Sequence, residues 1–193
     1  MDAQRTASGW IARPVVDPEP VAIVRDRLYG WLGAPEPYRR EDEPHLSLFG
    51  VRLPEPRAAD FERDLGAFGD TVGPRRVRTD GYRLYPSTRN PMVVAFDLGL
   101  SFDALASPVA DLLAIHGGRI DRDPVAPHVT LFKGGVRGEE LQWARLAERT
   151  RSRLAAAAGV DDDLDPPSRL LEPRLELTLG PPEIEWNGTI ADG

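Results

Sequence analysis

The chain has 193 residues, enough for one domain with a substantial core, since a chain of roughly 150 residues buries about two-thirds of its unfolded surface. It contains no cysteine, which excludes thiolate catalysis, iron–sulfur clusters and cysteine-ligated zinc. Its net charge of -7 argues against a broad, sequence-independent grip on a polynucleotide backbone. No stretch approaches the ~20 apolar residues of a membrane span, so we expect a cytoplasmic protein without a membrane partner.

The first half of the chain predicts strands and helices joined by polar loops. Val21, Val24 and Leu28 recur at helical spacing, whereas the segment after Pro44 is apolar and strand-like. We therefore expect a flexible N-terminus at 1–8, then a strand at 10–16, a helix at 18–32, a charged loop at 33–44, a strand at 45–53 and a helix at 57–68.

The second half continues the same mixture. We expect strands at 75–79, 82–85 and 92–98, a turn at 86–91, a helix at 102–115, a loop at 120–127 and a strand at 128–133. A long helix follows at 138–158, because this segment is rich in Ala, Leu, Glu and Arg. An acidic linker at 161–167 precedes strands at 174–179 and 183–189, the last of which can be an edge strand.

An internal repeat is the strongest signal in the sequence. The segments PHLSLF (44–49) and PHVTLF (127–132) match position by position, and each ends a Pro-containing acidic loop that follows a predicted helix. Two of the three histidines of the chain, His45 and His128, fall at equivalent places in the repeat.

Strand alternation groups the polar residues of each motif. Residues i and i+2 share a face of a strand, so His45 lies with Ser47 and His128 lies with Thr130, while the leucines and Val129 between them point into apolar packing. If the halves pack about a pseudo-twofold axis, the two imidazoles face each other across a cleft and the hydroxyls flank it.

This residue set suits chemistry at phosphorus. In-line attack needs one group to take a proton from the nucleophile and another to protonate the leaving oxygen, and histidine titrates near neutrality. The hydroxyls of Ser47 and Thr130 can donate hydrogen bonds to the non-bridging oxygens as charge develops. The arrangement predicts a phosphodiesterase that uses His45 and His128 as an acid and base pair.

The two His-x-Ser/Thr motifs resemble those of the 2H phosphoesterase superfamily, which includes RNA 2′,5′-ligase-like proteins and cyclic nucleotide phosphodiesterases. The resemblance implies an α+β fold in which two interleaved lobes, within one domain at 9–193, place antiparallel sheets around a central cleft with helices outside. It also implies catalysis without cofactor or metal on 2′,3′-cyclic or related 2′-linked phosphodiesters, at RNA ends or in cyclic oligonucleotides. We expect a monomer that takes a nucleotide or RNA-end substrate.

Substrate contacts are predicted from position alone. Lys133 lies near the second motif and is a candidate for binding an anion. Phe49 and Phe132 share the histidine face by alternation and can stack a base, as can Tyr85 and Trp10 near strand ends. An arginine-rich stretch at 75–89 can contact a phosphate, although a solvated sheet face is its more common role.

Four other interpretations stay open. Each motif histidine can be a satisfied core residue. A mononuclear metal site can be formed if His116 joins His45 and His128, although His116 ends a predicted helix, where the helix dipole favours a protonated surface histidine. The same motif residues can also serve a module that binds RNA or nucleotide ends without turnover, or an RNA 2′,5′-ligase that runs the reaction in reverse.

Overall fold

Two copies of one strand–helix–strand–strand unit build the fold. The computed structural model describes residues 5–32, 38–40, 42–85, 92–101, 103–122, 126–134, 152 and 175–190. The first unit consists of β1 (Thr6–Pro14), α1 (Glu19–Leu32), β2 (Tyr38–Arg40) and β3 (His45–Pro54). The second unit consists of β6 (Met92–Asp97), α3 (Asp103–Ile115), β7 (Arg119–Arg122) and β8 (His128–Gly134).

Further elements follow each unit. The first unit is followed by η1 (Glu55–Arg57), α2 (Ala58–Val72), β4 (Arg75–Arg78) and β5 (Gly81–Tyr85), and the described chain closes with β9 (Glu176–Leu179) and β10 (Glu183–Ile190). Of the described helices, none is long and apolar enough to cross a membrane.

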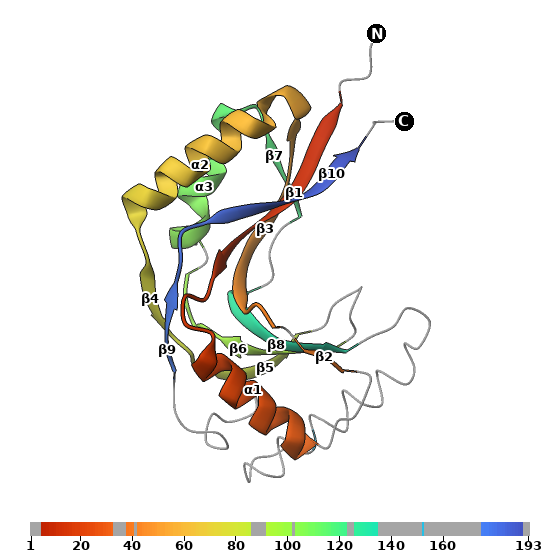
Figure 1. Ribbon diagram of the computed structural model, residues 1–193, viewed down its shortest axis with the longest axis vertical. Coiled ribbons are helices and arrows are strands. Elements are labelled where there is room, and N and C mark those ends of the chain that lie inside the picture. Colours follow the sequence, from red (N-terminus) through yellow and green to blue (C-terminus); the bar gives the residue numbers. More distant parts are fainter. Residues whose placement is uncertain are drawn as a thin grey trace.

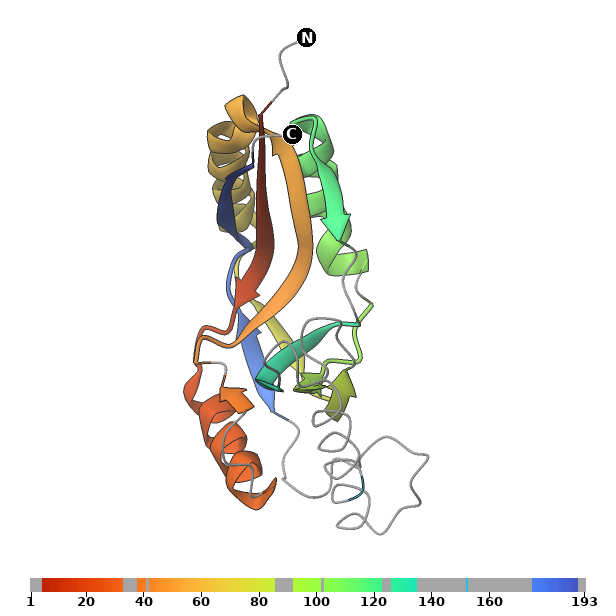
Figure 2. The ribbon, with the colours of Figure 1, turned by 90° about the vertical axis from the view of Figure 1, so that its right-hand side faces the viewer.

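The order of the strands is symmetric. The main sheet runs β10-β1-β3-β8-β6-β5 with antiparallel neighbours, and its four central strands, β1-β3-β8-β6, are mirrored when the two units are exchanged. The short strands cross over, because β2 pairs with β8 of the other unit and β7 pairs with β3. Strands β4 and β9 form a separate two-stranded sheet. The expected α+β fold with antiparallel strands and pseudo-twofold order is confirmed (Figures 1 and 2).

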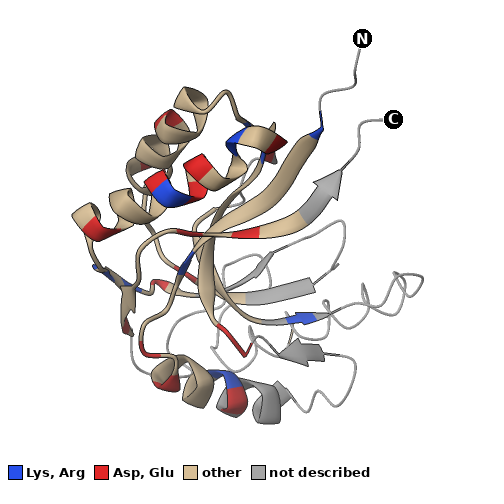
Figure 3. Ribbon diagram, turned by 45° about the horizontal axis from the view of Figure 1, so that its top comes forward, with Lys and Arg blue, Asp and Glu red and all other residues tan. Residues whose placement is uncertain are grey.

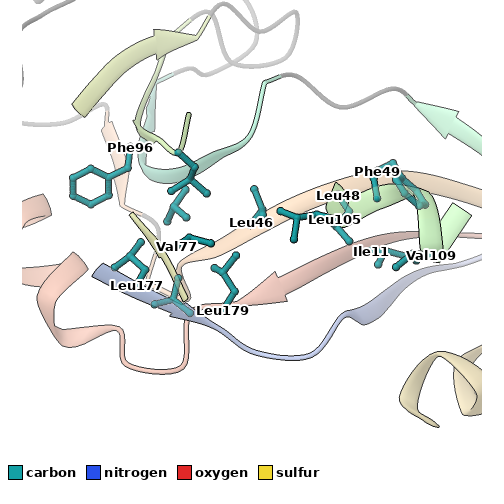
Figure 4. Packing of buried hydrophobic residues seen from close by; sticks show 14 of the residues in the cluster. Ile11, Leu46, Leu48, Phe49, Val77, Phe96, Leu105, Val109, Leu177 and Leu179 are labelled. Atoms are coloured by element: carbon teal, nitrogen blue, oxygen red, sulfur yellow. The ribbon is translucent and has the colours of Figure 1, made fainter. Parts of the chain in front are cut away.

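The helices cover the sheet on its buried face. Figure 1 shows α2 and α3 side by side over the part of the sheet that contains β3 and β10, whereas α1 lies at the other end, near β8. One apolar cluster connects them, and Figure 4 draws members of it from β1, β3, β4, β6, β9 and α3. The outer side of α2 carries acidic and basic residues together (Figure 3), where Arg63 contacts both Asp60 and Asp64.

Most expected elements are confirmed, and the differences concern short or terminal segments. Strand β1 begins at Thr6, inside the segment expected to be flexible, and α2 extends to Val72. Strands β2 and β7 lie where loops were expected. Both are short and charged, so no local pattern marks them, and they form only because each pairs with the motif strand of the other unit. Strand β10 lies at the edge of the sheet, as expected.

Some expectations lie outside the described residues. These are the turn at 86–91, the linker at 161–167 and the helix at 138–158, of which only Ser152 is described, as helical.

The buried face of the motif strands is expected to dominate stability. Leu46 is 0% exposed, so Leu46→Ala should lower the free energy of unfolding by about 2–5 kcal/mol through lost burial and a residual cavity. Ile115, which is 79% exposed, provides the control, and Ile115→Ala should cost less than about 1 kcal/mol. Urea unfolding followed by circular dichroism measures both. Equal losses in the two variants would contradict the assigned packing.

Candidate active site

The two motif strands meet at a single residue pair. Strands β3 and β8 pair antiparallel with Leu46 opposite Val129, and both side chains are fully buried. In this register His45 lies opposite Thr130 and Ser47 opposite His128, because partners on an antiparallel pair step in opposite directions. The four polar side chains therefore share the other face of the sheet, which we call the motif face. Residues diagonal to one another on such a pair, as the two histidines are, lie ~7–8 Å apart.

A β-bulge follows each motif at the same position. In the first unit, Ile11 pairs with Phe49 and Ala12 with Ser47, so Leu48 is the additional residue of β3. In the second unit, Val94 pairs with Phe132 and Ala95 with Thr130, so the additional residue of β8 is Leu131. A bulge interrupts the alternation of side chains, and every residue beyond it changes face relative to a regular strand.

The bulge corrects the expectation for Phe49. Regular alternation places Phe49 on the face of His45, but Leu48 and Phe49 are both 0% exposed and belong to the apolar cluster. Figure 4 draws Phe49 together with Leu105 of α3 and other members of this cluster. The face argument for base stacking by Phe49 was therefore wrong, because the bulge turns its ring into the core.

The equivalent bulge of β8, at Leu131, brings Lys133 to the motif face. Its side chain is half-buried, and its positive charge acts on His128. Trp10 also lies on this side, since its strand neighbour Ile11 is buried and Trp10 pairs with Gly50, beyond the bulge of β3. Phe132 lies in β8 and Tyr85 in β5, but their side chains lie outside the described residues.

Each motif histidine is oriented by its own loop. His45 Nδ1 lies 2.9 Å from the carbonyl oxygen of Glu43, and His128 Nδ1 lies 2.7 Å from that of Ala126. A carbonyl oxygen only accepts hydrogen bonds, so Nδ1 donates in both rings and Nε2 carries the lone pair of the neutral form. The two halves thus present the same ring nitrogen for proton transfer.

The charge state of His128 is biased towards neutral. Burial lowers the pKa of His128 below its usual value of 6.5, and the positive charges of Lys133 and His45 lower it further. The hydrogen bond to Ala126 and the negative charge of Asp97 partly offset these effects by raising the pKa. A neutral imidazole at this position is suited to accept a proton at neutral pH.

Asp97 is a site residue that the sequence did not suggest. It pairs with His128 across β6 and β8, it is 7% exposed, and its Oδ1 accepts a hydrogen bond of 3.1 Å from the Gly99 amide. The equivalent residue in the first unit is Pro14, which lies opposite His45. The only signal for Asp97 was a carboxylate that ends an apolar strand.

His116 is not part of the site. Its Nε2 lies 3.1 Å from Asp64 Oδ2, and its ring packs edge-on against Phe61 of α2. At 8% exposure it is buried rather than at the surface, so the expectation of a surface histidine was wrong. All three histidines are described, and no group of three His, Asp or Glu among the described residues could hold a metal ion. The three-histidine metal site is therefore not formed.

Comparison with known proteins decides the family. The family model described as the 2′-5′ RNA ligase superfamily matches residues 32–162, which contain both motifs. The chain belongs to this superfamily. This match confirms the expected kinship with 2H phosphoesterases. No curated protein matches the sequence significantly.

Two solved structures share the fold. Usb1 from Kluyveromyces marxianus is similar with a TM-score of 0.58 and 13% identity, over 98% of this chain and 97% of that chain. The PDE domain of MHV ns2 is similar with a TM-score of 0.51 and 14% identity, over 68% of this chain and 86% of that chain. At these identities the likeness shows the fold alone.

The pKa of His128 can be measured directly. NMR titration of its ring proton should give a midpoint below 6.5, and Lys133→Met should raise this midpoint because a neighbouring positive charge is removed. Asp97→Asn should lower it. Because the folded pKa lies below the unfolded one, His128 should also cost stability as the pH falls from 6.5 through the folded pKa. A midpoint above 6.5 would contradict the assigned environment.

Proposed function

We propose that this member of the 2′-5′ RNA ligase superfamily is a metal-independent phosphodiesterase that hydrolyses cyclic nucleotide phosphates. One observation carries the proposal: two imidazoles with the same Nδ1 hydrogen bond and two hydroxyls lie on one sheet face about a pseudo-twofold axis. The substrate class comprises 2′,3′-cyclic phosphates and related 2′-linked phosphodiesters, at RNA ends or in cyclic oligonucleotides.

The difference between the histidines supports separate roles. His128, whose pKa is lowered, accepts a proton from water as the water oxygen attacks phosphorus. His45, in its protonated form, donates a proton to the ribose oxygen as the phosphorus–oxygen bond breaks. The products are a phosphate monoester and a ribose hydroxyl, and the two rings then exchange their protons with solvent.

The surrounding groups stabilise the charge that develops on the phosphoryl oxygens. Ser47 and Thr130 can each donate a hydroxyl hydrogen bond to a non-bridging oxygen, and Thr130 is 7% exposed, so it is well shielded from water. Lys133 adds a positive charge on the same face. Trp10 provides an aromatic surface for a base on the first unit.

Nucleotides are the substrate class that the relatives support best. A structure of Kluyveromyces marxianus Usb1 contains uridine monophosphate, and ns2 carries a phosphodiesterase domain. The net charge of -7 fits a small nucleotide or one RNA end better than a long polynucleotide.

The test is turnover in EDTA of a panel of 2′,3′-cyclic mononucleotides, cyclic oligonucleotides and 2′,5′-linked dinucleotides. His45→Ala and His128→Ala should each lose at least ~100-fold in kcat, since each removes one proton-transfer group. Ser47→Ala and Thr130→Ala should each lose about 100-fold, the usual effect of one donor to a developing oxyanion.

His116→Gln is the matched control, because it changes the third histidine outside the site and should retain activity once folding is verified by circular dichroism. Binding of nucleotides without turnover would favour a recognition module, and formation of 2′,5′ linkages from RNA ends would favour a ligase. Activity that disappears with EDTA, or that survives both histidine substitutions, would overturn the proposal.

A further inference from the structure

A pocket lies behind the motif strands, on the side of the sheet opposite the motif face. Its volume is about 170 Å³, and it opens between α2, α3 and β1. Phe68 and Val72 of α2 and Leu105 and Val109 of α3 form apolar walls. Figure 1 shows these two helices side by side on this face. Such a volume can hold a group about the size of a benzene ring, for which a cavity of about 150 Å³ suffices.

Arg13 supplies the buried charge of the pocket. It pairs with Leu46 across β1 and β3, so it lies on the face opposite His45 and Ser47. Its side chain is held in place because Nε donates to the Gly180 carbonyl at 2.6 Å and Nη2 to the Gly73 carbonyl at 2.8 Å. The residue is only 6% exposed.

No described carboxylate neutralises this guanidinium. Among the residues that the structure describes, Arg13 makes no ion pair, and Nη1 makes no hydrogen bond. Burial lowers the pKa of Arg13, and the positive charge of Arg75 lowers it further. A buried cation with only carbonyl partners is costly, and a nearby like charge increases that cost.

Arg75 faces the same pocket. It lies two residues before the buried Val77, so the alternation of β4 places Arg75 on the same side of the strand as Val77 and Arg76 on the other side. The Arg75 side chain is itself exposed, so it borders the pocket on the solvent side. Arg75 lines the pocket together with Arg13, and the described lining residues include no Asp or Glu. The pocket therefore combines two cations with apolar walls.

We propose that this pocket binds a small organic anion, with a carboxylate or phosphate monoester between Arg13 and Arg75 and a compact apolar group against α2 and α3. Guanidinium groups match the planar oxygens of such anions and form charge-assisted hydrogen bonds with them. The anion offsets the repulsion between the two arginines, while the apolar group fills the space between the helices. The site is separate from the motif face, because the sheet lies between them.

The experiment is a titration of the isotope-labelled full chain followed by NMR, with benzoate and phenyl phosphate as probes. Benzoate and phenyl phosphate share an aryl group but carry different anionic groups, so their relative affinities show whether the pocket prefers a carboxylate or a phosphate monoester. Either probe should shift the amides of Gly73, Gly180 and the first turn of α3. Benzyl alcohol, which has the same ring without charge, should bind at least tenfold more weakly.

Three variants locate the binding. Arg75→Gln should weaken binding about tenfold, which corresponds to the loss of one charge-assisted interaction. Ala104→Phe should weaken binding at least tenfold, because Ala104 borders the pocket and a larger side chain there obstructs it while both arginines stay in place. Arg76→Gln is the matched control on the outer side of β4 and should have no effect.

Four results would overturn the proposal. The first is the absence of amide shifts with both probes at 20 mM, which is about the upper limit for a weak site. The second is binding of benzyl alcohol as tight as that of the charged probes, and the third is equal weakening of binding by Arg75→Gln and Arg76→Gln. The fourth is amide shifts confined to the region around His45 and His128. The test does not depend on turnover of any substrate, so it stands apart from the proposed phosphodiesterase activity.

Discussion

One antiparallel contact, Leu46 opposite Val129, holds the site together. It is the point where the two units of the fold meet in the main sheet, and both side chains are fully buried. Side chains alternate along a strand, so a slip of one residue here would send the histidines into the core and the apolar residues to the motif face. Packing of the two apolar residues therefore fixes the register that brings the four polar groups together.

The loops before the motifs support this register from the backbone. The Val15 amide donates to the Pro44 carbonyl at 2.9 Å, and the Leu98 amide donates to the Pro127 carbonyl at 3.2 Å, so the chain enters β3 and β8 in the same way. One residue further along, each histidine donates from Nδ1 to a carbonyl two residues upstream. Ring orientation is thus set by main-chain geometry that both units share.

The symmetry is broken where chemistry requires unequal partners. On the motif face, Asp97 and Lys133 lie near His128, whereas the equivalent positions in the first unit are Pro14 and Gly50. These two residues place opposite charges beside His128, at positions where the described part of the first unit carries no charge. A symmetric frame with an asymmetric set of charges can supply an acid and a base from the same motif, because each ring then has its own electrostatic environment.

The sequence by itself determined the repeat, the pairing of each histidine with a hydroxyl, and the burial of the residues between them. These features depend on the two-residue period of a strand, which is visible in any short window. Only the tertiary structure decided the bulges at Leu48 and Leu131, which move Phe49 into the core and Lys133 to the motif face. It also decided the place of Asp97 and the existence of β2 and β7. The bulges, the position of Asp97 and strands β2 and β7 all depend on pairing between segments far apart in the chain. The stability of such pairing cannot be predicted from the local sequence pattern of either segment.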